Sequence, residues 1–409
     1  MIIDSQASSA DSAATGSSKP AKSPRQPAAS GNEARRLVSL DVLRGLTVAF
    51  MILVNNAGDG SASFAQLRHS AWNGCTLTDL VFPLFLFIMG VSMTLSFEGR
   101  LTKGTAKSRI ALQAAKRAAL IFLLGLTLNA LPFFHLGTLR YCGVLQRIGI
   151  CYLLAALLLL VARIRGVALV TVVATTGYWL LMAYALVPGF GRSGLELGIL
   201  NPMGNLASAL DRLVIPREHL YHQGFYDPEG LLSTLPALAT VLFGVLTAAW
   251  LRRKGETTQQ KLAVLALCAG VLIVLGITWN ASFPINKRLW TSSYVLLCAG
   301  IAMGLLASVA WVVDKSGWFR REWLRGSLTP WLAFGTNALT AYIFSEVLSI
   351  ALGSIPLAGY GNVQRFTFEL LPAWLGSPSL RSFLWSLLFT GVCFLPVLWL
   401  YRRRIFIKL

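Results

Sequence analysis

The chain has 409 residues, of which 55% are hydrophobic and only 13% are charged. Apolar runs of about 20 residues recur along it, which indicates membrane-spanning α-helices and excludes a transmembrane β-barrel, whose strands are short and alternate in polarity. The formal net charge of +19 does not indicate nucleic-acid binding, because Lys and Arg cluster in short loops between the apolar runs, where they set membrane orientation. We therefore expect an all-α, polytopic membrane protein.

Residues 1–34 precede the first apolar run and are rich in Ser, Ala, Pro and Lys. Such a segment buries too little apolar surface to fold, so we expect a disordered tail. Residues 35–409 are expected to form one transmembrane domain. The sequence shows no clear inverted pair of broken helices of the kind that marks transporters. About ten apolar segments reach spanning length: 37–56, 79–98, 110–131, 143–162, 166–187, 230–251, 261–279, 292–313, 329–352 and 381–401.

The basic residues predict how these segments are oriented. If the spans alternate strictly, 25 of the 36 Lys and Arg residues lie on the side of both termini, ten lie on the opposite side, and Arg44 lies within the first span. Basic residues concentrate on the cytoplasmic side of membrane proteins. Both termini are therefore predicted to be cytoplasmic, and the loops after spans 1, 5, 7 and 9 are predicted to lie outside.

The loop after the first span carries residues suited to catalysis. It reads Arg68-His69-Ser70-Ala71-Trp72-Asn73-Gly74, and an imidazole takes and returns protons near neutral pH. Asn55 and Asn56 end the first span, where they could cap the helix or donate to a developing oxyanion. A hydrogen-bonded loop histidine is the alternative for His69, and an interfacial aromatic residue is the alternative for Trp72.

Several charged residues lie within the predicted spans, where ionised groups are costly and usually face the bundle interior or a wet cavity. Asp41 and Arg44 are three residues apart and share one helical face. They fit either an ion pair that locks helices together or a ligand pocket. Arg147 follows Gly143 and fits either packing support or an anion-binding role. Asp79 and Glu346 complete this set.

The remaining histidines and cysteines do not predict a metal site. His219 and His222 are three residues apart, but no acidic or Cys partner has supporting spacing. The six cysteines are scattered, with no CxxC motif. Pairing of Cys75 with Cys142 stays open.

Seven motifs together resemble the heparan-α-glucosaminide N-acetyltransferase family, and the chain looks most like bacterial inner-membrane relatives associated with N-acetylglucosamine utilisation. The matching positions run in order from about residue 36 to 345. The motifs are Leu40-Asp41-Val42-Leu43-Arg44-Gly45, Val54-Asn55, His69 to Gly74 with Asp79-Leu80-Val81-Phe82-Pro83, Gly143-Val144-Leu145-Gln146-Arg147, Asp227-Pro228-Glu229-Gly230, Pro284-Ile285-Asn286-Lys287 with Leu289-Trp290, and Asn337.

The resemblance implies that an acetyl group passes from cytosolic acetyl-CoA to the amine of a glucosamine-type sugar on the far side of the membrane. It implies His69 as the general base and Asn55 as the residue that assists it. Residues expected at the donor are Arg147, Lys287, Asp41 and Arg44, and those expected to bind or support the acceptor side are Asp79, Trp72, Asn73, Glu229 and Asn337. No metal is implied. The expected partners are acetyl-CoA, the amino sugar and membrane lipids, with a homodimer as one candidate assembly.

Two other functions remain as alternatives. Buried charges such as Asp41, Arg44 and Glu346 could line the path of a transporter or flippase for a sugar or lipid-linked sugar. An acyltransferase acting on another periplasmic glycan would use the same chemistry with a different acceptor. The sequence leaves open whether the donor is acetyl-CoA or a longer acyl-CoA, and whether transfer is direct or proceeds through an acylated His69. We favour direct transfer because it needs fewer assumptions.

Overall fold

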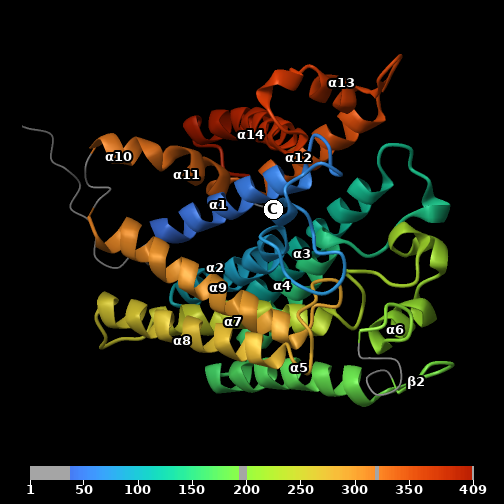
Figure 1. Ribbon diagram of the computed structural model, residues 1–409. Coiled ribbons are helices and arrows are strands. Elements are labelled where there is room, and N and C mark those ends of the chain that lie inside the picture. Colours follow the sequence, from blue (N-terminus) through green and yellow to red (C-terminus); the bar gives the residue numbers. More distant parts are fainter. Residues whose placement is uncertain (1–36, 193–199, 318–321, 408–409) are drawn as a thin grey trace, which may run out of the picture. The chain divides into compact units, whose positions relative to one another are not determined.

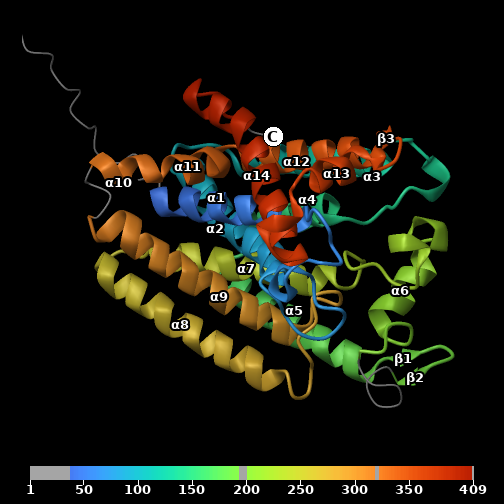
Figure 2. The same cartoon turned by 45° about the horizontal axis from the view of Figure 1, so that its top comes forward.

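The computed structural model describes residues 37–192, 200–317 and 322–407, so the predicted tail at 1–34 lies outside the described residues. Within these ranges, nine helices are long and apolar enough to cross a membrane. They run side by side in Figures 1 and 2 and confirm the all-α, polytopic fold class. These helices are α1 (Val38–Asn55), α2 (Val81–Leu101), α3 (Lys107–Ala130), α4 (Val144–Val161), α5 (Ile164–Tyr184), α7 (Thr234–Leu251), α8 (Thr258–Trp279), α9 (Ser292–Ala310) and α14 (Pro378–Arg402).

Shorter elements fill the connections between these helices. Two small antiparallel hairpins are the only sheets among the described residues. The connections contain α6 (Leu206–Val214), α10 (Glu322–Ser327), α11 (Thr329–Thr336), α12 (Ala338–Ser354), α13 (Val363–Glu369) and the hairpins β1 (Leu186–Val187) with β2 (Gly191–Arg192) and β3 (Pro356–Leu357) with β4 (Gly361–Asn362).

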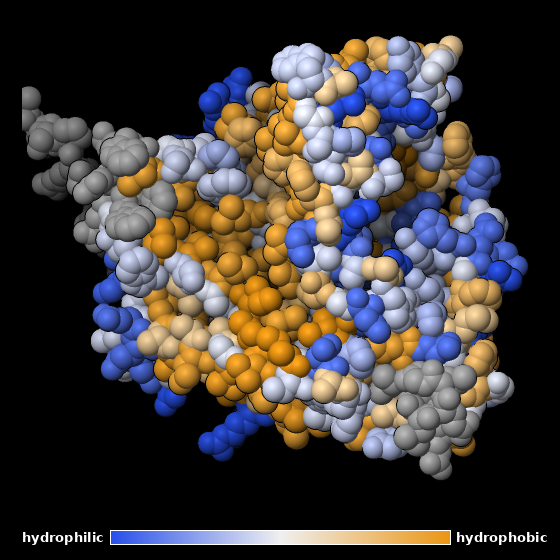
Figure 3. Space-filling model, in the orientation of Figure 1, coloured by the Kyte–Doolittle hydropathy of each residue, from blue (hydrophilic) through white to orange (hydrophobic). Residues whose placement is uncertain are grey.

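The outward faces of several helices are apolar, as expected where lipid replaces water. Leu123 of α3, Leu267 of α8 and Leu395 of α14 are each more than half exposed. Figure 3 shows apolar side chains gathered over the helices, with hydrophilic groups at the left edge and on the right, where α6 lies in Figure 1. A protein in water rarely exposes so wide an apolar surface, so this surface suits a bilayer.

The predicted span 329–352 is not one continuous helix, and this part of the prediction was wrong. The segment divides into α11 and α12 at Asn337, whose backbone leaves the helical conformation. The Asn337 side chain binds distant backbone groups with both ends of its amide. Its Nδ2 donates to the Ile405 carbonyl at 3.2 Å, and its Oδ1 accepts from the Ile407 amide at 3.1 Å. These two bonds tie the break to the segment that follows α14.

Helix α1 lies among α2, α9, α11, α12 and α14 and carries three of the predicted site residues, Asp41, Arg44 and Asn55. It approaches α11 closely, because glycines face each other at the crossing. A methyl group on Gly45 would meet the Trp331 carbonyl, and one on Gly335 would meet the Asp41 carbonyl. Small residues allow this kind of close backbone contact between membrane helices. The crossing fixes where α1 presents Arg44 and, at its other end, Asn55.

Gly335→Ala is expected to lower the free energy of unfolding by roughly 1–3 kcal/mol, because the added methyl group would push α1 away from α11. Gly270→Ala in α8 is the matched control, since nothing lies within 4 Å of a methyl group there. The control should keep or gain stability, because Ala favours a helix over Gly. Unfolding of both variants in detergent measures the difference, and equal stability would contradict the tight crossing.

Candidate active site

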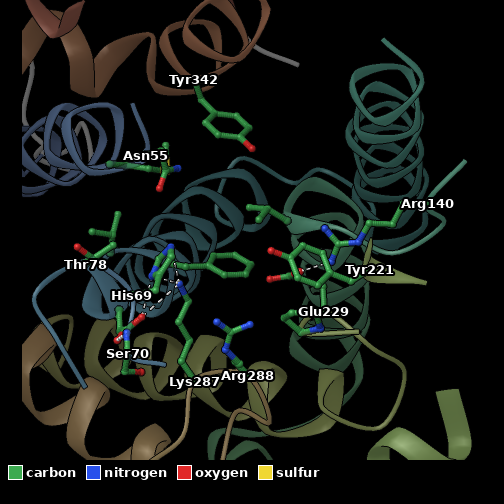
Figure 4. A pocket seen from close by; sticks show the side chains of 16 residues that line it. Asn55, His69, Ser70, Thr78, Arg140, Tyr221, Glu229, Lys287, Arg288 and Tyr342 are labelled. Carbon is green, nitrogen blue, oxygen red and sulfur yellow. Dashed lines mark hydrogen bonds and ion pairs between the residues drawn. The ribbon is translucent and has the colours of Figure 1, made fainter. Parts of the chain in front are cut away.

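A cavity of about 230 Å³ opens at the end of the bundle where α1 ends and α2 begins (Figure 4). Its wall combines apolar side chains from the helices with charged or titratable side chains from four loops. This mixture of an apolar pocket and a few convergent polar groups is typical of small-molecule sites. The lining residues are Met51, Asn55, His69, Ser70, Thr78, Asp79, Val81, Phe82, Arg140, Val144, Tyr221, Pro228, Glu229, Lys287, Arg288 and Tyr342.

His69 and Asp79 form a hydrogen-bonded pair in this wall. The His69 Nδ1 atom lies 2.8 Å from Asp79 Oδ1, and the Asp79 side chain is only 1% exposed whereas that of His69 is 46% exposed. The amides of Ser70 and Thr76 donate to the other carboxylate oxygen at 3.1 and 3.0 Å. An ionised carboxylate only accepts hydrogen bonds, so Nδ1 of His69 carries the proton. The Nε2 lone pair is then available as a base.

Lys287 completes a triangle with this pair. Its Nζ atom lies 3.0 Å from Nδ1 and 3.4 Å from Nε2 of His69, and 3.6 Å from Asp79 Oδ1. Burial lowers the pKa of Lys287 below its ordinary value, while the nearby charges of Asp79 and Glu229 act in the opposite direction. The structure thus brings together three predicted site residues from two loops that are about 200 positions apart in sequence.

Two loops that hold these residues are joined to each other. Gly74 donates its amide to the Ile285 carbonyl at 2.8 Å, and Asn286 Nδ2 donates to Asn73 Oδ1 at 3.2 Å. Trp72 Nε1 donates to the Leu200 carbonyl at 2.8 Å. Asn73 and Trp72 therefore support the loop that carries His69, and neither is among the residues that line the cavity.

The two asparagines at the end of α1 have different surroundings. Asn56 is buried, and its Nδ2 donates to the Ile52 carbonyl at 2.8 Å, so it performs the helix-capping role. Asn55 is exposed and lines the cavity above His69 in Figure 4. The capping interpretation therefore applies to Asn56, and the amide of Asn55 faces the space where a substrate would bind.

Arg140 is a cavity residue that the sequence interpretation missed. Its guanidinium donates to Asp227 at 2.9 and 2.5 Å and to Glu229 at 2.5 Å. Burial disfavours the charge on Arg140, but these two carboxylates outweigh burial and raise its pKa. The sequence did contain a signal for a cation at this position, because the Asp-Pro-Glu-Gly motif offers two carboxylates that need a positive partner. Arg140 was counted only as a basic residue that sets orientation.

Arg147 lies beneath the loop that carries Asp227 and Glu229. Its side chain is fully buried, and its Nη2 atom donates to the Gly230 carbonyl and to the Ser233 hydroxyl. The guanidinium also lies over the Trp290 ring, 5.2 Å from the ring centroid. Arg147 is absent from the cavity lining. These contacts favour its packing interpretation over direct contact with a ligand.

A second cavity of about 320 Å³ surrounds Arg44. Arg44 pairs with Asp41 at 2.8 Å and donates to Ser92 Oγ at 2.5 Å and to the Gly335 carbonyl at 3.1 Å. Arg117, which the sequence interpretation missed, also lines this cavity and lies over the Tyr152 ring at 5.0 Å. Both helical charges predicted at a ligand site are thus close to a cavity, although Asp41 itself does not line it.

A small apolar void of about 10 Å³ lies between the two cavities, and we call it the collar. It shares Met51, Phe82, Val144 and Tyr342 with the first cavity and Phe85, Ile148 and Leu339 with the second. The shared residues place the two cavities end to end along α1, α2, α4 and α12. The collar residues are Met51, Phe82, Phe85, Val144, Leu145, Ile148, Leu339 and Tyr342.

Other candidates lie away from both cavities. Asn337 and Glu346 line neither, although Glu346 follows the cavity residue Tyr342 by one helical turn. His219 is held by the Leu139 carbonyl and by Tyr141, on whose ring it stacks. Cys75 and Cys142 are free thiols and do not form the disulfide that the sequence left open.

Comparison with known proteins identifies a family. Residues 36–278 match the family model for heparan-alpha-glucosaminide N-acetyltransferase, catalytic. The heparan-alpha-glucosaminide N-acetyltransferase of Homo sapiens is 31% identical over 361 residues, which covers 76% of this chain and 53% of the human protein. The Mus musculus protein of the same name is 30% identical over 375 residues, covering 79% and 55%. The chain therefore spans about half the length of the curated relatives it matches, and the predicted family is confirmed.

The loop that carries Glu229 is expected to make stability depend on pH through Asp211. The buried Asp211 carboxylate accepts from the Leu231 and Asp227 amides, and burial raises its pKa to about 6. Because the unfolded value is about 3.8, the folded state binds the proton more tightly. The resulting stability, at most about 2–3 kcal/mol, is fully present below pH 3.8 and is lost as the pH rises through 6.

Thermal unfolding of the wild type and of Asp211→Asn between pH 4 and 7.5 tests this expectation. The wild type should lose more stability than the variant as the pH rises across this range, because an amide does not titrate. Parallel stability curves for the two proteins would contradict the assignment to Asp211.

Proposed function

The chain belongs to the heparan-alpha-glucosaminide N-acetyltransferase catalytic family, and from this premise we propose that it transfers an acetyl group from acetyl-CoA to the amine of a glucosamine-type sugar. The observation that carries the proposal is the His69–Asp79 pair beside Asn55, in a cavity joined end to end with a second cavity lined by arginines. No metal is needed for this chemistry.

The proposed step forms a C–N bond and breaks a C–S bond. The acceptor amine attacks the thioester carbonyl carbon, and His69 Nε2 takes the proton that the nitrogen loses. General base catalysis of this kind contributes about 10²–10⁴-fold. The thioester sulfur leaves as the CoA thiolate and is protonated afterwards. Asp79 holds the ring in the required tautomer and stabilises the imidazolium that forms.

Asn55 and Lys287 are suited to the negative charge that develops on the carbonyl oxygen. The Asn55 amide faces the cavity on the side opposite Lys287 in Figure 4. Donors placed at a developing oxyanion are typically worth about 3–4 kcal/mol. Lys287 was expected at the donor, and its short distances to His69 suit an electrostatic role at the reacting thioester.

The second cavity is proposed to receive the nucleotide part of the donor. Arg44 and Arg117 offer guanidinium groups for phosphates, which arginine binds through paired hydrogen bonds. The thin pantetheine arm would then pass the collar and present the thioester near His69. Arg147 would act indirectly, by holding the loop that carries Glu229.

The proposed orientation places the second cavity on the cytoplasmic side, where acetyl-CoA is available, in a bacterial inner membrane. It is supported by the excess of Lys and Arg in the loops that follow the even-numbered spans and at the termini. The acceptor cavity would then face the periplasm. A transporter would also have cavities at both ends of a passage, and the test below separates the two functions because a transporter makes no acetylated product.

His69→Ala is expected to lower turnover of labelled acetyl-CoA with glucosamine by at least about 10²-fold, because the amine loses its base. Asn55→Ala should lower turnover without loss of thermal stability, since its side chain is exposed. The assay measures labelled N-acetylglucosamine formed by the purified protein.

His135→Ala provides the control, because His135 is an exposed histidine that does not line the cavity. It should retain wild-type turnover. Near-normal turnover of His69→Ala would falsify the base assignment, and absence of acetylated product from the wild type would exclude this acceptor chemistry.

The orientation predicts that a cysteine at Ala65 reacts with an impermeant maleimide in sealed right-side-out vesicles, whereas a cysteine at Lys103 does not. Both positions are exposed in loops at opposite ends of α2, so they report on the two sides of the membrane. A variant without native cysteines carries each label site. Labelling of Lys103→Cys before permeabilisation, with Ala65→Cys protected, would reverse the proposed orientation.

A further inference from the structure

The charges around the first cavity are balanced overall but are not balanced locally. Lys287 faces Asp79 at 3.6 Å, which pairs one cation with one anion. Arg140 alone faces two carboxylates, Asp227 and Glu229. The cluster of Arg140, Asp227 and Glu229 therefore carries one negative charge in excess. Glu229 is the carboxylate of this cluster that lines the cavity.

Arg288 supplies the positive charge that balances this excess, but no acidic side chain in the described part of the chain pairs with it. None of the ion pairs found among the described residues involves it. Its Nη1 atom donates to the Tyr226 hydroxyl at 2.8 Å, and its Nε atom is buried with no hydrogen-bond partner in the described structure. Figure 4 shows Arg288 entering the cavity beside Lys287. Tyr226 in turn packs against Trp72, so the guanidinium is held in place.

Arg288 is half-buried, and a guanidinium that makes one hydrogen bond and no ion pair among the described residues keeps donors that a ligand in the cavity can use. Arginine recognises planar or tetrahedral oxyanions such as carboxylate and phosphate through its fork of donors. The ligand that suits this wall therefore carries an anionic group toward Arg288. Glu229, on the neighbouring loop, suits the ammonium group of the same ligand.

We propose that Arg288 forms an acceptor subsite for an anionic substituent, so that the preferred acceptor is an amino sugar that also bears a carboxylate or a phosphate. This inference rests on the proposed acetyl transfer and specifies its acceptor class. A zwitterionic sugar would add no net charge to a wall whose own charges already cancel. A plain amino sugar would leave Arg288 without an anionic partner.

The donor is not the source of this anion. The phosphates of CoA have Arg44 and Arg117 at the second cavity, and the apolar collar separates that cavity from Arg288. Arg288 therefore distinguishes acceptors from one another, and its loss should leave donor affinity unaffected.

The test compares acceptors with the purified full-length protein and labelled acetyl-CoA. The acceptors are glucosamine, which is neutral apart from its amine, glucosamine 6-phosphate and muramic acid, which carries a carboxylate. At least one anionic acceptor should show a kcat/KM about tenfold or more above that of glucosamine, because a charged hydrogen-bonded pair supplies that much discrimination. The two anionic acceptors separate phosphate from carboxylate as the preferred group.

Arg288→Gln should bring this ratio to within about twofold of one, and Arg288→Lys should leave an intermediate ratio because it keeps the charge and loses the fork. Arg365→Gln is the matched control. Arg365 is an exposed arginine on α13, paired with Glu369 at 2.9 Å and absent from the cavity lining, so its loss should leave the ratio unchanged. Melting temperatures confirm that each variant is folded.

Calorimetric binding of the same three sugars gives a readout that does not depend on turnover. If the wild type binds an anionic sugar more tightly than glucosamine and Arg288→Gln loses this preference, the subsite is supported. This holds even if no sugar is acetylated, and in that case only the proposed function fails. Acetylation of all three sugars with equal kcat/KM overturns the subsite and leaves the function standing. A preference that persists in Arg288→Gln, or a loss of acetyl-CoA affinity in that variant, also overturns it.

Discussion

The ionised carboxylate of Asp79 is the group on which the candidate active site depends. It is almost fully buried, and a buried charge is tolerated only when charges and hydrogen bonds compensate it. The compensation comes from His69, from the backbone of the loop before α2, and from Lys287. The Asp79 backbone carbonyl also accepts from the Tyr294 hydroxyl at 2.5 Å. The carboxylate thereby joins the two loops that carry the proposed base and its cationic neighbour, and the carbonyl of the same residue joins them to α9.

The sequence predicted the helices well, because their signal is strong locally, and three of the predicted site residues lie together in the structure. Apolar runs fix where helices form, and the order of motifs indicated that His69, Asp79 and Lys287 belong to one site. The sequence also offered two roles for the asparagine pair, and the structure divides them between Asn55 and Asn56. The break at Asn337 was missed because hydropathy is continuous across it. The partners of the Asn337 side chain are backbone groups of Ile405 and Ile407, far away in the chain.

The arginines show why the rest of the site could not be read from the sequence. Arg117, Arg140 and Arg288 were counted as charges that orient the helices, and a charge count does not distinguish a loop arginine in water from one that faces a cavity. The difference arises only when distant segments meet. Arg140 becomes part of the wall of the first cavity because Asp227 and Glu229 lie against it. Arg288 becomes part of the same wall because Tyr226 holds it there. Arg147 shows the converse, since a motif match placed it at the donor and its contacts place it beneath a loop.

The collar bears most directly on whether this chain moves a sugar or a chemical group. A sugar that crossed it would leave several hydroxyl groups without hydrogen-bond partners among Met51, Phe85 and Leu339, at a free-energy cost for each group. The pantetheine arm of CoA is thinner than a sugar and carries fewer polar groups along its length, two amides and a hydroxyl, so fewer hydrogen bonds are lost in the same collar. Arginines at the second cavity and the charged wall around His69 lie at opposite ends of the collar, so a nucleotide and a sugar can each remain in its own polar cavity. Only the arm needs to cross the apolar layer, and this arrangement favours group transfer over sugar transport.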